Sequence, residues 1–310
     1  MKEQNYTFTV QSPVKRIDVL LVDYFEETGG VFSRNSIQDL IKSGNVLVNG
    51  KTIKPSKALS GGETIEIKIP EAPPLNIRPQ NIPIRVVYED NHIIVINKTP
   101  DLVVHPAPGN YEGTLVNAVS YHCDGKLSTI GGETRSGVVH RLDKETSGLI
   151  VMAKDNLSHL DLARQFSDKS AGRQYTAVIW GVPEEKHDRW ETFFGRHPID
   201  RKKFTSKLTN GKKAVTNYYV IKDNGEESVV NVILETGRTH QIRVHMQDHD
   251  YAIIGDPVYG KRKQKAVSIK RQALHARSLT ITHPVFKQRM TFFSPLEHDI
   301  KKLIKELGLC

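Results

Sequence analysis

The sequence has 310 residues, 38% of them hydrophobic and 25% charged, which is enough for two globular domains with buried cores. Its 44 Lys and Arg against 35 Asp and Glu give a net charge of +9, which favours a polyanionic partner but can also simply aid solubility. Cys123 and Cys310 are too few and too far apart for a disulfide framework or a thiolate zinc site, and no stretch is apolar enough for a signal peptide or membrane span. We therefore expect a cytoplasmic protein without a metal site.

Helix and strand signals follow one another in the N-terminal part. Residues 16–22 place apolar side chains at helical spacing, and Ser33 suits the N-cap of a second amphipathic helix over 36–42. Residues 46–51 are typical of a strand that enters an Asn-Gly hairpin turn. Residues 64–69 alternate apolar and polar side chains, as in a half-buried strand. The pattern predicts two short helices followed by a small hairpin.

This order of elements resembles the S-four RNA-binding module, which is named for a small-subunit ribosomal protein. The matching residues are Arg16-Ile17-Asp18, Ser33-Arg34 and Gly44-x-Val46-x-Val48-Asn49-Gly50. The resemblance implies that basic side chains of this segment bind RNA, and the candidates are Arg16, Arg34, Lys42, Lys51 and Lys54. Residues 1–80 carry only 10 Lys and Arg against 9 Asp and Glu, so these cations alternatively form an ordinary solvated surface.

A proline-rich stretch separates this part from the rest of the chain. Four prolines lie within residues 71–83 and predict an extended linker. After it, strand patterns recur over 86–90, 93–98, 149–153, 175–180, 214–221, 229–235, 273–282 and 290–293. Helices are expected near 113–119 and 157–168. Many strands without βαβ alternation predict an α+β fold around a mostly antiparallel sheet, with domains over 13–70 and 84–305.

The segment from Gly137 to Ala153 is the most informative part of the sequence. It reads Gly-Val-Val-His-Arg-Leu-Asp-Lys-Glu-Thr-Ser-Gly-Leu-Ile-Val-Met-Ala, a charged loop between two apolar, strand-like runs. Such a loop holds polar groups on rigid elements. Its four-residue core alone is also compatible with a plain loop ion pair and a turn cap.

The order His140-Arg141-Leu142-Asp143-x-x-Thr146-Ser147-Gly148 resembles the signature of RNA pseudouridine synthases of the RluA/RluD type. Further matches are Arg173-Gln174-Tyr175, Gly237-Arg238-Thr239-His240-Gln241-Ile242-Arg243, and Gly255-Asp256-x-x-Tyr259-Gly260. The likeness spans about residues 13–300. It departs at Glu145, where many relatives carry Asp, and at Ser136, where Pro is common.

The resemblance implies three catalytic residues. Asp143 is then the nucleophile, because a carboxylate can attack, leave again, and needs no cofactor. An arginine of the 237–243 motif aligns Asp143, and position in the motif favours Arg243, with Arg238 as the other possibility. Tyr175 then offers a π-face to the base and a hydroxyl for proton relay. Without the motifs, Tyr175 would read as a half-buried tyrosine of a strand.

The target uracil must leave its stack to reach such a site. His140 and Arg141 flank Asp143 and can hold the RNA backbone or fill the vacated space. Further candidates for phosphate contacts are the Arg238 side chain and the basic runs Arg201, Lys202, Lys203, Lys212 and Lys213. Runs of like charge are, however, often plain solvated loops.

The resemblance therefore implies a cofactor-free isomerase, expected as a monomer, that acts on structured RNA. Large-subunit ribosomal RNA is the expected substrate, and transfer RNA is possible. One alternative is a non-catalytic RNA-binding or ribosome-assembly protein that keeps the fold. Another is a hydrolase that uses His140 and Asp143 with Ser147, although no Gly-x-Ser-x-Gly motif surrounds Ser147.

Overall fold

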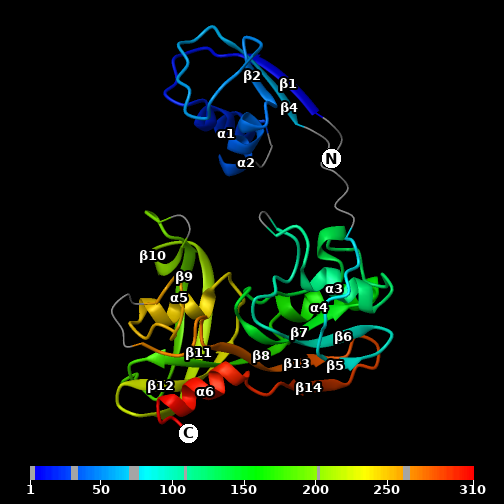
Figure 1. Ribbon diagram of the computed structural model, residues 1–310, viewed down its shortest axis with the longest axis vertical. Coiled ribbons are helices and arrows are strands. Elements are labelled where there is room, and N and C mark those ends of the chain that lie inside the picture. The colour runs from blue at the N-terminus through cyan, green and yellow to red at the C-terminus, as the bar shows by residue number, and fades with distance from the viewer. Residues whose placement is uncertain (1–3, 29–33, 70–76, 108–109, 201–202, 261–265) are drawn as a thin grey trace. The chain divides into compact units, whose positions relative to one another are not determined.

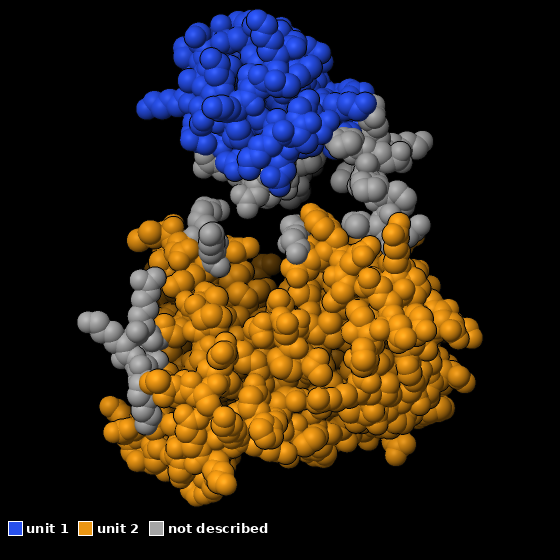
Figure 2. Space-filling view, viewed as in Figure 1, with its two compact units in different colours: residues 1–75 blue, residues 76–310 orange. Residues whose placement is uncertain are grey.

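The computed structural model describes residues 4–28, 34–69, 77–107, 110–200, 203–260 and 266–310. The chain divides into two compact units, Met1–Leu75 and Asn76–Cys310, which are coloured separately in Figure 2. No helix in these ranges is long and apolar enough to cross a membrane. Residues 77–83, predicted as part of the linker, have no regular secondary structure and belong to the second unit.

The first unit packs two helices against a small antiparallel sheet (Figure 1). Its elements are β1 (Gln4–Thr9), α1 (Ile17–Glu27), α2 (Arg34–Lys42), β2 (Val46–Val48), β3 (Lys51–Thr52) and β4 (Thr64–Ile69). The strand order is β1-β4-β2-β3. Asn49 and Gly50 adopt positive φ angles of 49° and 72°, as a tight hairpin turn between β2 and β3 requires. The helices and hairpin follow the sequence prediction.

Strand β1 was not predicted. It lies before residue 13, where the first domain was expected to begin, and it pairs with β4 from Gln4↔Ile69 to Thr9↔Thr64. It alternates exposed residues with the half-buried Tyr6 and Phe8, which pack against the core of this unit. The described part of the unit therefore starts with a half-buried edge strand, and its alternating pattern was a signal that the sequence prediction missed.

The second unit is built on one ten-stranded sheet. Its strands are β5 (Val86–Glu89), β6 (Ile93–Lys98), β7 (Ser147–Ala153), β8 (Gly172–Trp180), β9 (His187–Arg196), β10 (Phe204–Leu208), β11 (Lys212–Asp223), β12 (Glu227–Leu234), β13 (Leu274–Thr282) and β14 (Arg289–Phe293). The order is β10-β9-β11-β12-β8-β13-β7-β6-β5, with β14 beside β13, and Figure 1 shows it from β12 at the left to β5 at the right. Only the β7–β13 pair is parallel among these strands. The predicted α+β class with a mostly antiparallel sheet is confirmed.

Helices cover both faces of this sheet. They are α3 (Leu115–His122), α4 (Asn156–Ser167), α5 (Gln241–Asp248) and α6 (His298–Glu306), with a short 3-10 turn at Glu133–Arg135. Strands β6 and β7 are buried along their whole length, because α3 packs with Ile94 and Ile96 while α4 packs with Ile93 and Val95. Strands β9 and β10 and helices α5 and α6 were not predicted. The large sheet thus forms a rigid base for the loops at its centre.

Candidate active site

A pocket of about 400 Å³ opens over the middle of the large sheet, within the usual size range of small-ligand sites. Three segments line it: residues 139–143 before β7, residues 166–175 between α4 and β8, and residues 234–243 between β12 and α5. Each segment contains one of the motifs singled out in the sequence. Pairing of β8 with β12 and β13, and of β13 with β7, brings these distant segments to one place.

Asp143 and Arg243 meet in this pocket. Arg243 Nη1 donates to Asp143 Oδ2 at 2.9 Å, although the residues lie 100 positions apart. The opposite edge of the guanidinium donates two hydrogen bonds to Asp256, from Nε to Oδ2 (2.7 Å) and from Nη2 to Oδ1 (3.0 Å). Side-chain exposure is 18% for Asp143, 5% for Arg243 and 0% for Asp256. The guanidinium is therefore fixed between two carboxylates, and only Asp143 reaches the pocket opening.

Opposing effects set the ionisation of this triad. Burial alone would lower the pKa of Arg243, but Asp256 and Asp143 raise it above its usual value. Burial alone would raise the pKa of Asp256, but hydrogen bonds from Arg243, Tyr259 N–H and Val258 N–H leave it below its usual range. Both groups are therefore charged at neutral pH. The sequence had shown Gly255-Asp256 only as a motif match, with no role for Asp256.

Helix α5 positions Arg243, and a buried glutamine fixes where the helix begins. Gln241 Oε1 accepts from the Thr236 hydroxyl (2.8 Å) and from Arg238 N–H (2.9 Å). Gln241 Nε2 donates to Val215 O (3.0 Å) and to the hydroxyl of Thr216 (2.9 Å) on β11. Gln241 thus connects the loop at Thr236 and Arg238 to β11, two residues before Arg243.

His240, just before α5, is a site residue that the sequence did not reveal. Its φ is 60°, in the left-handed region that non-glycine residues seldom adopt outside functional sites and turns. Its Nδ1 lies 3.0 Å from the Tyr259 hydroxyl, and its Nε2 lies 4.0 Å from Asp143 Oδ1. Burial lowers the pKa of His240, and Asp143 partly opposes this. The ring therefore faces the carboxylate oxygen that Arg243 leaves free.

The buried side chains of Lys98 and Arg271 donate hydrogen bonds to the backbone of the loop that follows Asp143. Lys98, only 1% exposed, donates to the carbonyl oxygens of Thr99 (2.8 Å), Leu102 (3.0 Å) and Lys144 (2.9 Å). Burial lowers the pKa of Lys98 to about 7. Arg271 donates to the carbonyl of Glu145 at 3.0 Å. The backbone after Asp143 is thus held by hydrogen bonds from the Lys98 and Arg271 side chains.

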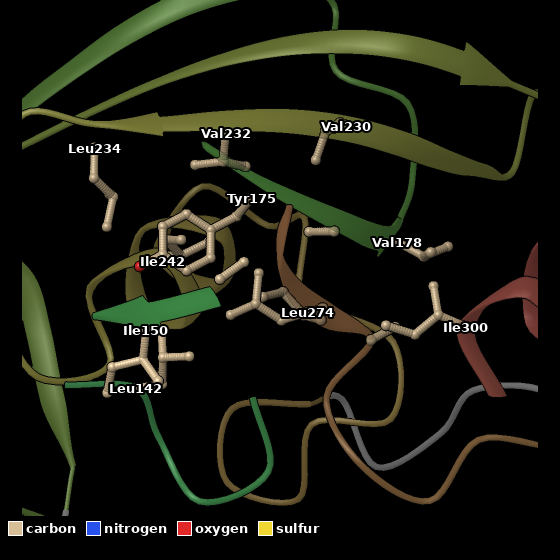
Figure 3. Close-up of a cluster of buried hydrophobic side chains, with 14 of the residues drawn as sticks. Leu142, Ile150, Tyr175, Val178, Val230, Val232, Leu234, Ile242, Leu274 and Ile300 are labelled. Carbon is tan, nitrogen blue, oxygen red and sulfur yellow. The ribbon is translucent and has the colours of Figure 1, made fainter. Parts of the chain in front are cut away.

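Tyr175 forms part of the pocket floor. Its side chain is 6% exposed and lies among Leu142, Leu234, Ile242 and Leu274, as Figure 3 shows. Burial raises the pKa of Tyr175, and Arg173 opposes this while Asp143 adds to it. The hydroxyl is therefore neutral at physiological pH, close to Asp143 in a largely apolar wall.

The neighbours of Asp143 in the motif differ in their surroundings. His140 stacks on Phe166 with ring centroids 4.3 Å apart, and its Nε2 accepts from Val151 N–H at 3.0 Å. Burial, and then Arg173, lower the pKa of His140 to about 3, so the ring is neutral. Arg141 is exposed at the pocket. The two residues were predicted together as RNA contacts, but only Arg141 is exposed, and His140 is half-buried.

The predicted basic contacts lie mostly at the surface. Arg238 is exposed and its Nε donates to Lys213 O at 3.1 Å, while the Lys213 ammonium pairs with Glu191. Lys212 is also exposed, and Lys203 is half-buried. Arg201 and Lys202 lie outside the described residues. Arg238 therefore lies at the pocket rim and makes no contact with Asp143.

In the first unit, Lys51 and Lys54 are exposed. Arg16 Nε donates to the buried Asp18 at 2.9 Å, and Lys42 lies 3.8 Å from Asp39. The side chain of Arg34 lies outside the described part of the chain. The described cations thus reach solvent, so they are available to a polyanion.

A hydrolase with Ser147 as nucleophile was also considered from the sequence, and no metal site was expected. Ser147 Oγ lies 2.9 Å from His275 Nδ1, and both side chains are 0% exposed, so Ser147 faces the sheet interior rather than the pocket. This arrangement gives a Ser147-based hydrolase no accessible nucleophile. Within the described ranges, no group of three or more His, Cys, Asp or Glu could hold a metal ion.

Comparison with known proteins gives consistent results along the chain. A family model described as RNA pseudouridylate synthase matches residues 92–248, and a model described as S4 domain, the S-four module above, matches residues 15–65. The chain is 41% identical over 284 residues to the ribosomal large subunit pseudouridine synthase D of Zymomonas mobilis, covering 89% of each chain. It is 38% identical to an uncharacterized RNA pseudouridine synthase of Bacillus subtilis, covering 99% of each. The structure of human RNA pseudouridylate synthase domain containing 1 superposes with a TM-score of 0.56 at 21% identity, covering 77% of this chain and 98% of that one, which shows a shared fold.

Proposed function

The chain belongs to the RNA pseudouridylate synthase family and is an isomerase, and we propose that it converts specific uridines of large-subunit ribosomal RNA with Asp143 as nucleophile. Names of relatives that share about 40% of its residues support the choice of RNA. The assignment of Asp143 as nucleophile rests on one observation: its carboxylate oxygen Oδ2 lies 2.9 Å from Arg243 Nη1 inside the pocket. Its oxygen Oδ1 is left free to react.

The reaction moves ribose C1′ from N1 of uracil to C5. In our proposal Oδ1 of Asp143 bonds to C1′ as the C1′–N1 bond breaks and the electron pair goes to the base. The base then turns within the pocket. C5 bonds to C1′ as the ester to Asp143 breaks, and the C5 proton is then lost while N1 takes up a proton. No step consumes a cofactor, because the product is an isomer of the substrate.

The surroundings of Asp143 suit these steps. Arg243 holds Oδ2 and directs the carboxylate, since a guanidinium aligns its partner in a plane. Tyr175 presents a ring to the detached base and a neutral hydroxyl near C5. His240, opposite Oδ1, is neutral by virtue of its lowered pKa, so it does not compete with Arg243 for the carboxylate. The basic rim and the S4 domain then bind the RNA backbone.

Pseudouridine mapping tests this proposal. Total RNA from cells with and without the gene is treated with carbodiimide and read by primer extension. We expect stops in large-subunit ribosomal RNA to disappear without the gene, to return with the wild-type gene, and to stay absent with Asp143→Asn. Loss confined to transfer RNA would reassign the substrate, and an unchanged map would contradict the proposed activity.

A further inference from the structure

Arg173, at the start of β8, is a buried cation without a protein partner. It is 8% exposed, and its Nε is fully buried with no acceptor. Among the described residues, the guanidinium makes no hydrogen bond and no ion pair; it lies over the Phe166 ring, 5.5 Å from Cζ, with Nη1 beside Gly237. A contact of this kind offsets only part of the cost of burying a charge. The pocket wall therefore holds a largely buried guanidinium that has no anionic partner among the described residues.

The carboxylates of the pocket are already occupied. Asp143 is held by Arg243, and Glu235 accepts from Arg189 Nε at 2.8 Å and from its Nη2 at 3.2 Å. The pocket is also shaped around Arg173, because a Cβ at Gly237 would overlap Nη1 of Arg173. The chain thus leaves room for the guanidinium but supplies no anion to it.

A second unpaired donor lies beside the same aromatic ring. Since His140 Nε2 accepts from the Val151 N–H, the proton of the neutral imidazole is on Nδ1. That Nδ1 is buried and has no acceptor among the described residues. The imidazole stacks on Phe166, the ring that Arg173 also contacts. The His140 Nδ1–H is therefore closed off from solvent, whereas the guanidinium of Arg173 lines the pocket.

We propose that Arg173 binds a phosphodiester group adjacent to the target uridine through the terminal nitrogens of its guanidinium. This inference rests on the proposed function, because it takes RNA as the ligand. An anion is required to balance a buried guanidinium, and the phosphodiesters are the anions of RNA, whereas uracil is neutral. A guanidinium also matches two phosphate oxygens at once. Arg173 thereby holds the sugar-phosphate backbone at the site while the base is detached.

The first test does not require that the chain isomerise anything. Uridine 3′,5′-bisphosphate and unphosphorylated uridine are titrated against the full chain by calorimetry. We expect Arg173→Gln to weaken binding of the bisphosphate by roughly 10- to 100-fold, the range for losing hydrogen bonds to a charged group, and to leave uridine binding unchanged. Arg164→Gln is the matched control, because Arg164 is an exposed arginine of α4 paired with Asp161. Equal bisphosphate affinity in wild type and Arg173→Gln would overturn the inference.

Thermal unfolding separates ligand binding from a structural role. A structural arginine lowers the unfolding temperature when it is removed. An unpaired buried charge does not, so unliganded Arg173→Gln should unfold at the temperature of the wild type or above it. A lower unfolding temperature together with unchanged bisphosphate affinity would show that Arg173 only packs the wall.

The final test uses RNA that contains the mapped uridine with a neutral methylphosphonate at the linkage 5′ or 3′ to it. One of the two replacements should slow the wild type roughly 10- to 100-fold and should have no further effect on Arg173→Gln. Equal sensitivity of both proteins would overturn the inference while leaving the synthase activity intact. Absence of isomerisation by the wild type would contradict the proposed function, and the bisphosphate titration would still decide the role of Arg173.

Discussion

Arg16 in the first unit and Arg243 in the second each contact a buried aspartate, yet their surroundings differ. The Arg16 side chain is 42% exposed, whereas that of Arg243 is 5% exposed and lies between two carboxylates. An exposed cation attracts RNA through a field that salt screens. A buried one is screened far less and acts by holding its partner in a fixed position. The first unit is therefore suited to RNA affinity, and the second to precise placement of reacting groups.

The strongest test of this contrast is Asp143→Asn. The amide keeps the shape of the carboxylate but is a poor nucleophile, so we expect the single-turnover rate to fall by roughly 10⁴-fold or more. RNA affinity should stay within a few-fold, because Asp143 adds no positive charge. Tritium release from carbon-5-labelled uridine in RNA measures the rate. Appreciable residual activity would contradict the assignment of the nucleophile.

The two motif arginines provide the next comparison. Arg243→Lys should lower the single-turnover rate by roughly 10²- to 10³-fold with a modest change in affinity, because lysine keeps the charge but cannot hold Asp143 and Asp256 together. Arg238→Lys is the matched control, and its larger effect should be on RNA affinity, since Arg238 is exposed at the rim. The opposite pattern would exchange the two roles without changing the enzyme class.

Asp256→Asn should affect both catalysis and stability. The amide cannot balance Arg243, so we expect a roughly 10- to 100-fold slower reaction and a loss of about 3 kcal/mol of unfolding free energy at pH 7. Since the pKa of Asp256 is lower when folded, its stabilisation is full above the unfolded value of about 3.9 and disappears as pH falls through the folded value. Denaturation at pH 7 and at acid pH should show the variant and the wild type converging. A constant difference at all pH values would contradict this reading.

Deleting residues 1–75 should have the smallest effect. The second unit has its own hydrophobic cores, so it should remain folded. RNA affinity should fall by about tenfold, and the slope of its logarithm against that of salt concentration should flatten, because fewer phosphates are neutralised. Filter binding at several salt concentrations measures both. Equal affinity and an equal slope would show that the first unit makes no phosphate contact.

The sequence predicted those parts of the molecule in which local chemistry is decisive. The Asn49-Gly50 turn follows from residue type, and β6 and β7 from their apolar runs. By contrast, β9 buries only Trp190 and Phe194 fully, so it has no strong strand pattern. Helix α5 buries polar residues, including Gln241, and therefore shows no amphipathic stripe. In α6 the buried residues Ile300 and Leu303 are spaced as on one face of a helix, a pattern from which this helix could have been predicted.

The candidate site likewise has features that the sequence predicts and features that only the fold shows. Asp143, Tyr175 and Arg243 were found through motifs, but the two carboxylates on Arg243 depend on contacts between distant segments. Asp256 resembles an ordinary turn residue until its burial is known. The lack of a partner for Arg173 is likewise invisible in the sequence, because only the folded wall shows what surrounds a side chain. Residue type predicts which reactions a side chain can take part in, whereas packing determines which charged groups have a partner of opposite charge.

The position of β13 has a consequence for the order in which the protein becomes active during synthesis. This strand lies between β7, which follows the Asp143 loop, and β8, which contains Tyr175. Leu274, where β13 begins, follows Tyr175 by about a hundred residues, on the order of 5–20 s of translation. Until β13 is inserted, the two halves of the pocket have no common sheet. A nascent chain can therefore already contain Asp143, Tyr175 and Arg243 while the sheet that brings their segments together is still incomplete.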